Sequence, residues 1–349
     1  MTSMWHLRCG SFFGLAAFTA LLCGCDGALA APVPAPAPLL GSAPPSAVGP
    51  DSVTLLRSGA ATFAQLQLLL DAARRSVHLE MYEFTLPSLV GAVIAAHARG
   101  VAVVVIDDPS ETSSAATAQQ LRAAGVDIVD YPVRRLMIDH VKLLVVDSEV
   151  AVVGGINWGT ASSANHDYDA MIRGPAVSNL DRVFLRDVVT CGGTATVPDP
   201  LRDTGVIVAS TLPAAEIRPL ALQLINGATR SLHLELFVLT DTGIVHALEA
   251  AHARGVAVWL LLDPSQHSSD PSYQALLGSG VPIRWYRARG ELLHAKTIVA
   301  DSSAVLFGSA NWSGGGFARN HEVDIEMPRA PAVAAEMLDQ MALDWTASR

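Results

Sequence analysis

The sequence has 349 residues and a formal net charge of −10, with 50% hydrophobic and only 16% charged residues. This length allows two ordinary domains or one large one, and the apolar content excludes disorder of the whole chain. Because the chain is acidic, it has no overall basic face for nucleic acid, and such binding would need local arginine clusters. Of the 23 basic residues, only Lys142 and Lys296 are lysines, and each follows a histidine by two positions.

The first 25 residues predict an export signal. Arg8 precedes an uncharged stretch from Gly10 to Cys25, which has the length of a signal-peptide hydrophobic region and is short for a membrane-spanning helix. Its end, Leu22–Cys25, resembles the bacterial lipobox, which implies cleavage before Cys25 and lipid attachment to its thiol. An ordinary signal cleaved near residues 28–31 is the alternative. We therefore expect an exported protein, lipid-anchored in the bacterial cell envelope and facing the periplasm or the exterior.

The rest of the chain contains one long repeat. Residues 75–81 (RSVHLEM) return as residues 230–236 (RSLHLEL), and residues 95–110 return as residues 250–265, both at an offset of 155. Solenoid repeats are much shorter, whereas this period suits an ordinary domain. The sequence therefore predicts a duplicated domain.

These patterns divide the chain into four segments. Residues 1–25 form the signal peptide, and residues 26–50, rich in Pro and Ala, form an extended tether. The first domain is predicted over residues 51–192 and the second over residues 193–349, with the Gly/Thr/Pro-rich stretch 191–200 as their junction.

Both domains show the same order of predicted elements. A helix precedes a β-rich segment, a second helix ends at a glycine, and a continuous apolar segment follows, bounded by Asp-Pro. Helices are predicted at 62–74, 87–99, 217–228 and 242–254, and strands at 77–84, 101–106, 127–131, 141–146, 150–154, 232–239, 256–262, 282–286, 295–300 and 304–308. Strand–helix alternation that gives way to adjacent strands predicts an α/β fold, with helices covering a mixed sheet.

One motif in each domain carries candidate chemistry. Residues two apart on a strand face the same side, so the histidine and lysine of each motif point into one site. A lysine neutralises phosphate oxygens, an asparagine donates to them, and imidazole attacks phosphorus or transfers protons near neutral pH. A single copy would equally fit a buried structural histidine, but two copies that use both lysines favour phosphate chemistry. The motif residues are His140, Lys142, Asp147 and Asn157, and His294, Lys296, Asp301 and Asn311.

The pattern HxKxxxxD followed by GGxN or GSxN, present twice, resembles the phospholipase D superfamily over residues 51–345. The resemblance implies two tandem phospholipase D-like α-β-α sandwich domains with pseudo-two-fold symmetry. It also implies one active site between them, in a monomer that holds both half-sites. His140 would attack phosphorus to give a phosphohistidine, while His294 would protonate the leaving alcohol and then activate water or a second alcohol.

The resemblance also assigns supporting roles. Asp167 and Glu322, downstream of the motifs, would orient the imidazoles through the second ring nitrogen. Asp147 and Asp301 are expected to be structural. No cofactor or metal is expected, because lysine and imidazolium supply the positive charge.

Other repeated polar residues admit two interpretations. Glu80 and Glu235 either reach the site from strand ends or pair with arginine. His166 and His321 lie inside the Asn-His-acid segments, where they either line the site or pack elsewhere. Packing, surface or turn roles are favoured for the remaining polar residues of these segments: His78, His97, Asp107, Asp108, His233, His252 and Asp263.

We expect a phospholipase D-type phosphodiesterase that acts on phospholipids at a membrane surface, with hydrolysis preferred over transfer. The alternative is transfer of the phosphatidyl group to an alcohol, because the motif strands resemble the cardiolipin synthase branch. Nuclease activity is less expected, because loss of Arg8 with the signal makes the chain more acidic and DNA binding depends on basic side chains. An idle binding module is disfavoured by the complete motifs in both domains. Two local clusters keep the nuclease possible and would equally bind anionic lipid: Arg134 and Arg135, and Arg284, Arg287 and Arg289.

Overall fold

The computed structural model describes residues 50–202, 204–287 and 291–348. The predicted signal peptide with Cys25, the tether up to residue 49, and Arg289 lie outside the described residues. Within these ranges, no helix has both the length and the apolar character needed to cross a bilayer.

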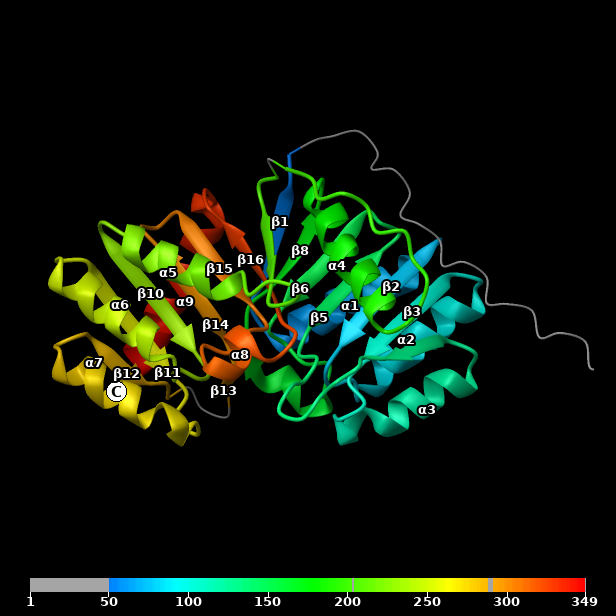
Figure 1. Ribbon diagram of the computed structural model, residues 1–349, viewed down its shortest axis with the longest axis horizontal. Coiled ribbons are helices and arrows are strands. Elements are labelled where there is room, and N and C mark those ends of the chain that lie inside the picture. Colours follow the sequence, from blue (N-terminus) through cyan, green and yellow to red (C-terminus); the bar gives the residue numbers. More distant parts are fainter. Residues whose placement is uncertain (1–49, 203, 288–290, 349) are drawn as a thin grey trace, which may run out of the picture. The chain divides into compact units, whose positions relative to one another are not determined.

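The first half of the described chain folds around a seven-stranded mixed sheet (Figure 1). Its elements are β1 (Ser52–Leu56), α1 (Gly59–Ala72), β2 (Ser76–Met81), α2 (Pro87–Ala98), β3 (Ala102–Asp107), α3 (Ala115–Ala123), β4 (Asp127–Asp130), β5 (Lys142–Val146), β6 (Val150–Gly154), β7 (Asn165–His166), β8 (Asp169–Arg173) and α4 (Ala176–Thr190). The strand order is β1-β8-β6-β5-β2-β3-β4, in which β2, β3 and β4 run parallel and the other pairs are antiparallel.

The second half repeats this topology. Its elements are β9 (Ile207–Ser210), α5 (Ile217–Gly227), β10 (Ser231–Leu236), α6 (Thr242–Ala253), β11 (Ala257–Leu262), α7 (Asp270–Gly278), β12 (Ile283–Trp285), β13 (Leu292–Leu293), β14 (Lys296–Ala300), β15 (Ala304–Gly308), α8 (Gly314–Ala318), β16 (Val323–Met327) and α9 (Pro331–Ala347). The order β9-β16-β15-β14-β10-β11-β12 matches the first sheet strand for strand. The predicted α/β fold of two similar tandem domains is confirmed. The division at residue 192 stays a prediction.

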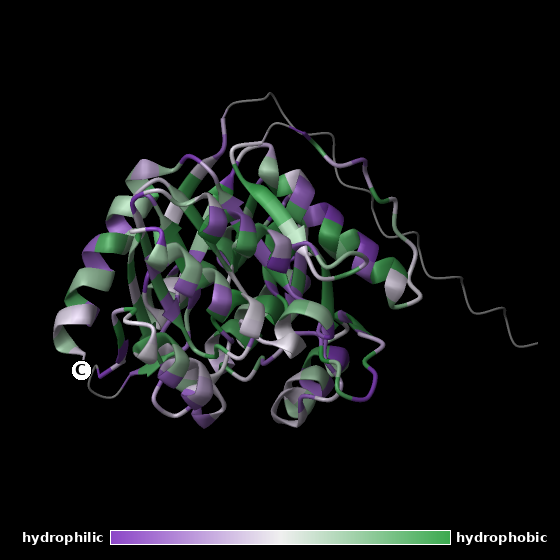
Figure 2. Cartoon of the chain, turned by 60° about the vertical axis from the view of Figure 1, so that its left-hand side comes forward, coloured by the Kyte–Doolittle hydropathy of each residue, from purple (hydrophilic) through white to green (hydrophobic). Residues whose placement is uncertain are grey.

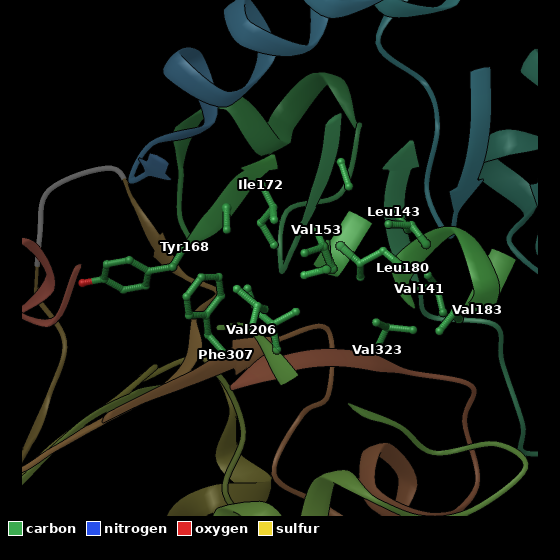
Figure 3. Packing of buried hydrophobic residues seen from close by; sticks show 14 of the residues in the cluster. Val141, Leu143, Val153, Tyr168, Ile172, Leu180, Val183, Val206, Phe307 and Val323 are labelled. Atoms are coloured by element: carbon green, nitrogen blue, oxygen red, sulfur yellow. The ribbon is translucent and has the colours of Figure 1, made fainter. Parts of the chain in front are cut away.

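The two halves share a hydrophobic core. Alternation along β5 sends Leu144 towards α1 and α2, and Leu143 to the opposite face, where α4 lies. The cluster on that face joins Leu143 and Val153 of the first half with Phe307 and Val323 of the second (Figure 3). Figure 2 shows mostly hydrophobic strands between helices that alternate hydrophobic and hydrophilic residues. Burial of apolar surface therefore holds the halves together as well as each sheet.

Two short backbone pairings also cross between the halves. β13 pairs in parallel with β7, and Asp139 forms a parallel bridge with His321. The backbone N–H of His140 then donates to the carbonyl of His321 at 2.8 Å. These pairings place the residues before each motif histidine beside the Asn-His-acid segment of the opposite half.

Candidate active site

Each motif histidine is bound to a carboxylate from the opposite half of the chain. His140 Nδ1 lies 2.9 Å from Glu322 Oε2 and 3.1 Å from the carbonyl oxygen of Ser309. His294 Nδ1 lies 2.9 Å from Asp167 Oδ2. Because Nδ1 lies against a carboxylate in both rings, Nε2 is the nitrogen that can react, and in His294 it also lies 3.1 Å from Lys296 Nζ. The crossed pairs mean that neither half holds a complete site.

The two motif lysines lie beside the histidines and are almost fully buried. Lys142 Nζ donates to the carbonyl of His140 at 2.6 Å, and Lys296 Nζ lies 2.8 Å from Nδ1 and 3.1 Å from Nε2 of His294. Burial lowers the pKa of Lys142 to about 7 and that of Lys296 to about 8. A phosphate diester between the two lysines would favour their charged forms, since opposite charges stabilise each other.

The charged groups of the two half-sites lie close enough to act on each other. Burial lowers the pKa of His140 well below its usual value, and Lys142, Lys296 and His294 lower it further. Burial and Lys296 likewise lower the pKa of His294. Both imidazoles are therefore neutral near pH 7. In a neutral imidazole Nε2 either carries the lone pair, and can attack phosphorus or accept a proton, or carries the hydrogen, and can donate it.

The carboxylate partners of the two histidines differ. Burial raises the pKa of Glu322 to about 7, against the effect of Lys142. Burial would also raise the pKa of Asp167, but the nearby His294 and Lys296 outweigh it and lower that pKa. Asp167 is therefore ionised at neutral pH, whereas Glu322 is close to half-protonated.

Asn157 and Asn311 follow β6 and β15, the strands that pair with β5 and β14, which begin at the motif lysines. The antiparallel pairing of β5 with β6 brings the segment after Gly154 back towards the His140 end of β5. Gly154 also packs closely against Asp169 of the neighbouring strand β8. A Cβ on Gly154 would lie only 2.6 Å from the Cα of Asp169, so only glycine fits at this position. In the described part of the chain, the Oδ1 atoms of both asparagines are buried and have no hydrogen-bond partner.

The motif aspartates lie at the other end of these strands, in the hairpin turns. Asp147 accepts the backbone N–H groups of residues 74–76, and Asp301 accepts those of residues 229–231. Both have a positive φ, of 55° and 52°. Their contacts join the turn to the start of β2 or β10, which agrees with a structural role.

Two further aspartates position the histidine segments. Asp108 Oδ2 accepts the N–H of Asp139 at 2.8 Å, and Asp263 Oδ2 accepts the N–H of Leu293 at 2.9 Å. Each bond therefore holds the residue immediately before a motif histidine. Both aspartates also accept the backbone N–H of the serine two residues on, so the predicted turn role is confirmed. The bond to the histidine segment was not predicted, although the repeated Asp-Pro-Ser offered a signal.

His166 and His321 form buried clusters with carboxylates of the opposite half. Glu80 and Glu235 pair with histidines of the opposite half, so these glutamates tie the halves together. Burial would lower the pKa of His166, but Glu235 outweighs it and raises that pKa to about 9. The clusters, which offer three potential metal ligands each, are His166, Glu235 and Asp344, and His321, Glu80 and Asp187.

Comparison with known families identifies this arrangement. A family model described as "Cardiolipin synthase, PLD-like domain" matches residues 66–188 and again residues 221–345. The chain belongs to this phospholipase D-like family. The predicted membership of the phospholipase D superfamily is thereby confirmed.

Relatives of this phospholipase D-like chain include two cardiolipin synthases. That of Halalkalibacterium halodurans is 29% identical over 325 residues, which cover 82% of this chain and 64% of the relative. That of Geobacillus kaustophilus is 30% identical over 310 residues, which cover 77% of this chain and 61% of the relative. The chain thus spans less than two thirds of the length of these relatives.

Two solved structures share the fold of this phospholipase D-like chain. Phosphatidylserine synthase of Haemophilus influenzae matches with a TM-score of 0.65 at 12% identity, covering 83% of this chain and 85% of its own. Polyphosphate kinase of Porphyromonas gingivalis matches with a TM-score of 0.60 at 16% identity, covering 84% and 46%. The structure therefore places the histidines, lysines and acids of a phospholipase D-like pair of motifs in one site, and their catalytic roles stay predictions.

Proposed function

We propose that this protein transfers the phosphatidyl group of a phospholipid to an alcohol through a phosphohistidine intermediate. The observation that carries the proposal is the pair of crossed histidine–carboxylate contacts around two buried lysines. The cardiolipin synthase relatives support transfer, which the sequence analysis held as the alternative to hydrolysis. Hydrolysis by water is then the competing side reaction.

The residues of the site suit both steps of such a transfer. One imidazole attacks phosphorus through Nε2, and the other protonates the leaving alcohol and then deprotonates the acceptor. Lys142 and Lys296 neutralise the charge that develops on the phosphoryl oxygens. The two histidines are only 5% and 6% exposed, so both reactive rings lie in a largely enclosed site.

The surface beside the site supports a lipid rather than a nucleic acid. Arg134 and Arg135 are exposed in the segment that leads to His140, and the adjacent Leu136 is 75% exposed. An exposed apolar side chain next to two cations suits the interface of an anionic membrane. Arg284 instead donates to the carbonyl of Trp345 at 2.6 Å and stacks over its ring.

Anchoring belongs to the proposal as well. Lipid attachment at Cys25 would keep the site close to the envelope membrane that supplies its substrate. Labelling with radioactive palmitate should mark the full chain and be lost in Cys25→Ser. Labelling that persists in this variant would contradict the anchor.

One assay separates the candidate activities. The protein is incubated with mixed phosphatidylglycerol and phosphatidylethanolamine vesicles, with and without glycerol, and in parallel with single- and double-stranded DNA. Cardiolipin or an exchanged headgroup is the expected product, and His140→Ala should produce neither. Phosphatidic acid as the only product would indicate a hydrolase, while cleaved DNA beside intact lipid would overturn the lipid substrate.

A further inference from the structure

The walls around the two motif histidines differ at three matched positions. In the first half these positions carry a phenol and two carboxylates. In the second half a phenyl ring replaces the phenol, and a branched aliphatic side chain and a neutral amide replace the two carboxylates. All six side chains are partly exposed. At the offset of 155, the matched pairs are Tyr82 and Phe237, Glu83 and Val238, and Glu111 and Gln266.

The two aromatic residues contact the reacting groups of their own half. The Tyr82 ring meets the His140 ring edge-on at 5.0 Å, and Lys142 Nζ lies 5.2 Å from the Tyr82 centroid. The Phe237 ring lies 4.8 Å from that of His294. The polar and the apolar wall therefore adjoin different histidines.

The two carboxylates of the polar wall adjoin Tyr82, the residue that contacts His140 and Lys142. Glu83 follows Tyr82 in the chain and Glu111 shares a hydrogen bond with its phenol, while Lys142 acts on both carboxylates at longer range than an ion pair. Burial and Glu111 raise the pKa of Glu83, against the effects of Lys142 and Asn157. Burial would raise the pKa of Glu111, but hydrogen bonds from its turn and from Tyr82, together with Lys142, lower it. Two partly exposed carboxylates beside a phosphate-binding lysine would repel a second phosphate, and they offer acceptors for hydroxyl or ammonium groups.

We propose that Tyr82, Glu83 and Glu111 bind the alcohol in this reaction, both as the departing headgroup and as the acceptor. The ligand class is a small alcohol with further hydrogen-bond donors, either hydroxyls, as in glycerol, or an ammonium group, as in ethanolamine. The lipid-ester side of the phosphate then lies towards Phe237 and Val238. This inference rests on the proposed phosphatidyl transfer.

The position of the alcohol assigns the two histidines. In an in-line displacement the nucleophile and the leaving oxygen lie on opposite sides of phosphorus. An alcohol beside His140 therefore makes His140 the proton donor and His294 the nucleophile. This assignment reverses the one implied by the superfamily resemblance.

The two steps balance with these residues alone. The Nε2 lone pair of His294 forms the N–P bond while the P–O bond to the headgroup breaks, and the headgroup oxygen takes the bond pair and a proton from His140 Nε2. The proton held between Glu322 and His140 passes to Nδ1, so the ring stays neutral. The acceptor hydroxyl next gives its proton to His140 Nε2, and its oxygen bonds to phosphorus. The N–P bond then breaks, and its electron pair returns to His294.

The carboxylate partners support the same assignment. Glu322 lies beside Nδ1 of His140 and accepts hydrogen bonds from the Ser309 hydroxyl at 2.7 Å and from the Asn320 amide at 3.0 Å. With a pKa of about 7 for Glu322, this pair can hold an exchangeable proton near neutral pH, as an acid requires. The ionised Asp167 instead increases the electron density of the His294 ring, which suits a nucleophile.

A leaving group that needs no proton tests the assignment. Phosphatidyl-p-nitrophenol should give one equivalent of p-nitrophenolate with His140→Ala, and a base-stable, acid-labile phosphate on the peptide that contains His294. His294→Ala should give no burst, and thermal melts should show that both variants are folded. A burst with His294→Ala and label on His140, or a burst with neither variant while the wild type turns over, overturns the assignment. A wild type that releases no p-nitrophenolate contradicts the proposed transfer itself.

A second experiment tests the alcohol subsite by replacing its carboxylates with the residues that the second half has at the matched positions. Glu83→Val combined with Glu111→Gln should lower the ratio of transfer product to phosphatidic acid about tenfold, as expected when hydrogen bonds to charged groups are lost. The control, Glu149→Gln, neutralises an exposed carboxylate that pairs with Arg75 at 2.8 Å, and it should change that ratio less than twofold. Glycerol and ethanolamine are compared as acceptors. If the ratio falls with only one of them, the carboxylates bind the hydroxyls of glycerol or the ammonium group of ethanolamine, respectively. An unchanged ratio with both acceptors overturns the subsite.

Discussion

The two halves of the chain have the same strand order, yet they contribute different chemistry to one site. Asp108 and Asp263 hold the histidine segments through the same backbone bond in each half. By contrast, the acid that binds each histidine is Glu322 on one side and Asp167 on the other. Duplication thus supplied the symmetric backbone, and side-chain changes within it can separate the roles of the two histidines.

The largest effect is expected from replacing either motif histidine, which tests whether the two halves depend on each other. His140→Ala and His294→Ala should each lower kcat for phosphatidyl transfer by about four orders of magnitude or more, because each removes one of two coupled steps. The double variant should be no worse than either single one. Product formation on lipid vesicles measures this, and a single variant within tenfold of the wild type would show that one half suffices.

The lysines should follow with a smaller loss. Lys142→Ala and Lys296→Ala should each reduce kcat by about two to three orders of magnitude, as when one donor to a developing oxyanion is removed. Arg218→Ala provides a control, since it removes a cation from a surface pair with Asp241, and kcat should stay within twofold. An equally small effect for either lysine would exclude it from charge neutralisation.

Much of this architecture could be predicted from the sequence, because the repeat and the apolar periodicity are local signals. The helix predicted at 87–99, for example, corresponds to α2. The crossed pairing of His140 with Glu322 could not be read directly, because it joins residues 182 positions apart. The clusters around Glu80 and Glu235 were equally hidden, since only the shared core brings the two halves into contact.

Variants of the two carboxylate partners should differ in the pH dependence of their activity. Asp167→Asn and Glu322→Gln should each lower kcat about 10- to 100-fold, as for residues that orient a reactive imidazole. Because the pKa of Glu322 is about 7, a proton held by its pair is lost as the pH rises through 7, and activity should fall there. Glu322→Gln should remove or move this limb of the pH–rate profile, whereas Asp167→Asn should retain it. The same limb in both variants would contradict the distinction.

Two matched aspartates should make stability depend on pH in the same way in both halves. Burial raises the pKa of Asp169 and of Asp324 to about 8. A carboxyl with a raised folded-state pKa stabilises the fold below its unfolded pKa of about 4, and this stability is lost as the pH rises towards 8. The wild-type Tm should therefore fall between pH 5 and pH 8.

Amide replacement tests this dependence. Asp169→Asn and Asp324→Asn keep an oxygen for the N–H groups of Ile156 and Ala310, so each should flatten the decline. Thermal melts across this pH range measure the effect, with the exposed Asp127→Asn as control. A decline as steep as in the wild type would show that these carboxyls are not its source.

The smallest expected effect concerns the hydroxyl that only the second half supplies to its acid. Ser309 Oγ donates to Glu322 Oε2 at 2.7 Å, whereas a Cβ on the matched Gly155 would lie 2.5 Å from Asp167 Oδ1. Ser309→Ala removes one hydrogen bond from a buried carboxylate, which at about 1 kcal/mol predicts roughly a fivefold loss of kcat.

The direction of its pH shift makes this change diagnostic. Since the Ser309 hydroxyl lowers the pKa of Glu322, its removal should raise that pKa and move the descending limb of the pH–rate profile to higher pH. Thr297→Val removes another buried hydroxyl of the same sheet, which donates to the carbonyl of Leu306 instead, and it should leave the limb in place. If Ser309→Ala lowers Tm but does not move the limb, Ser309 supports the fold without tuning the acid.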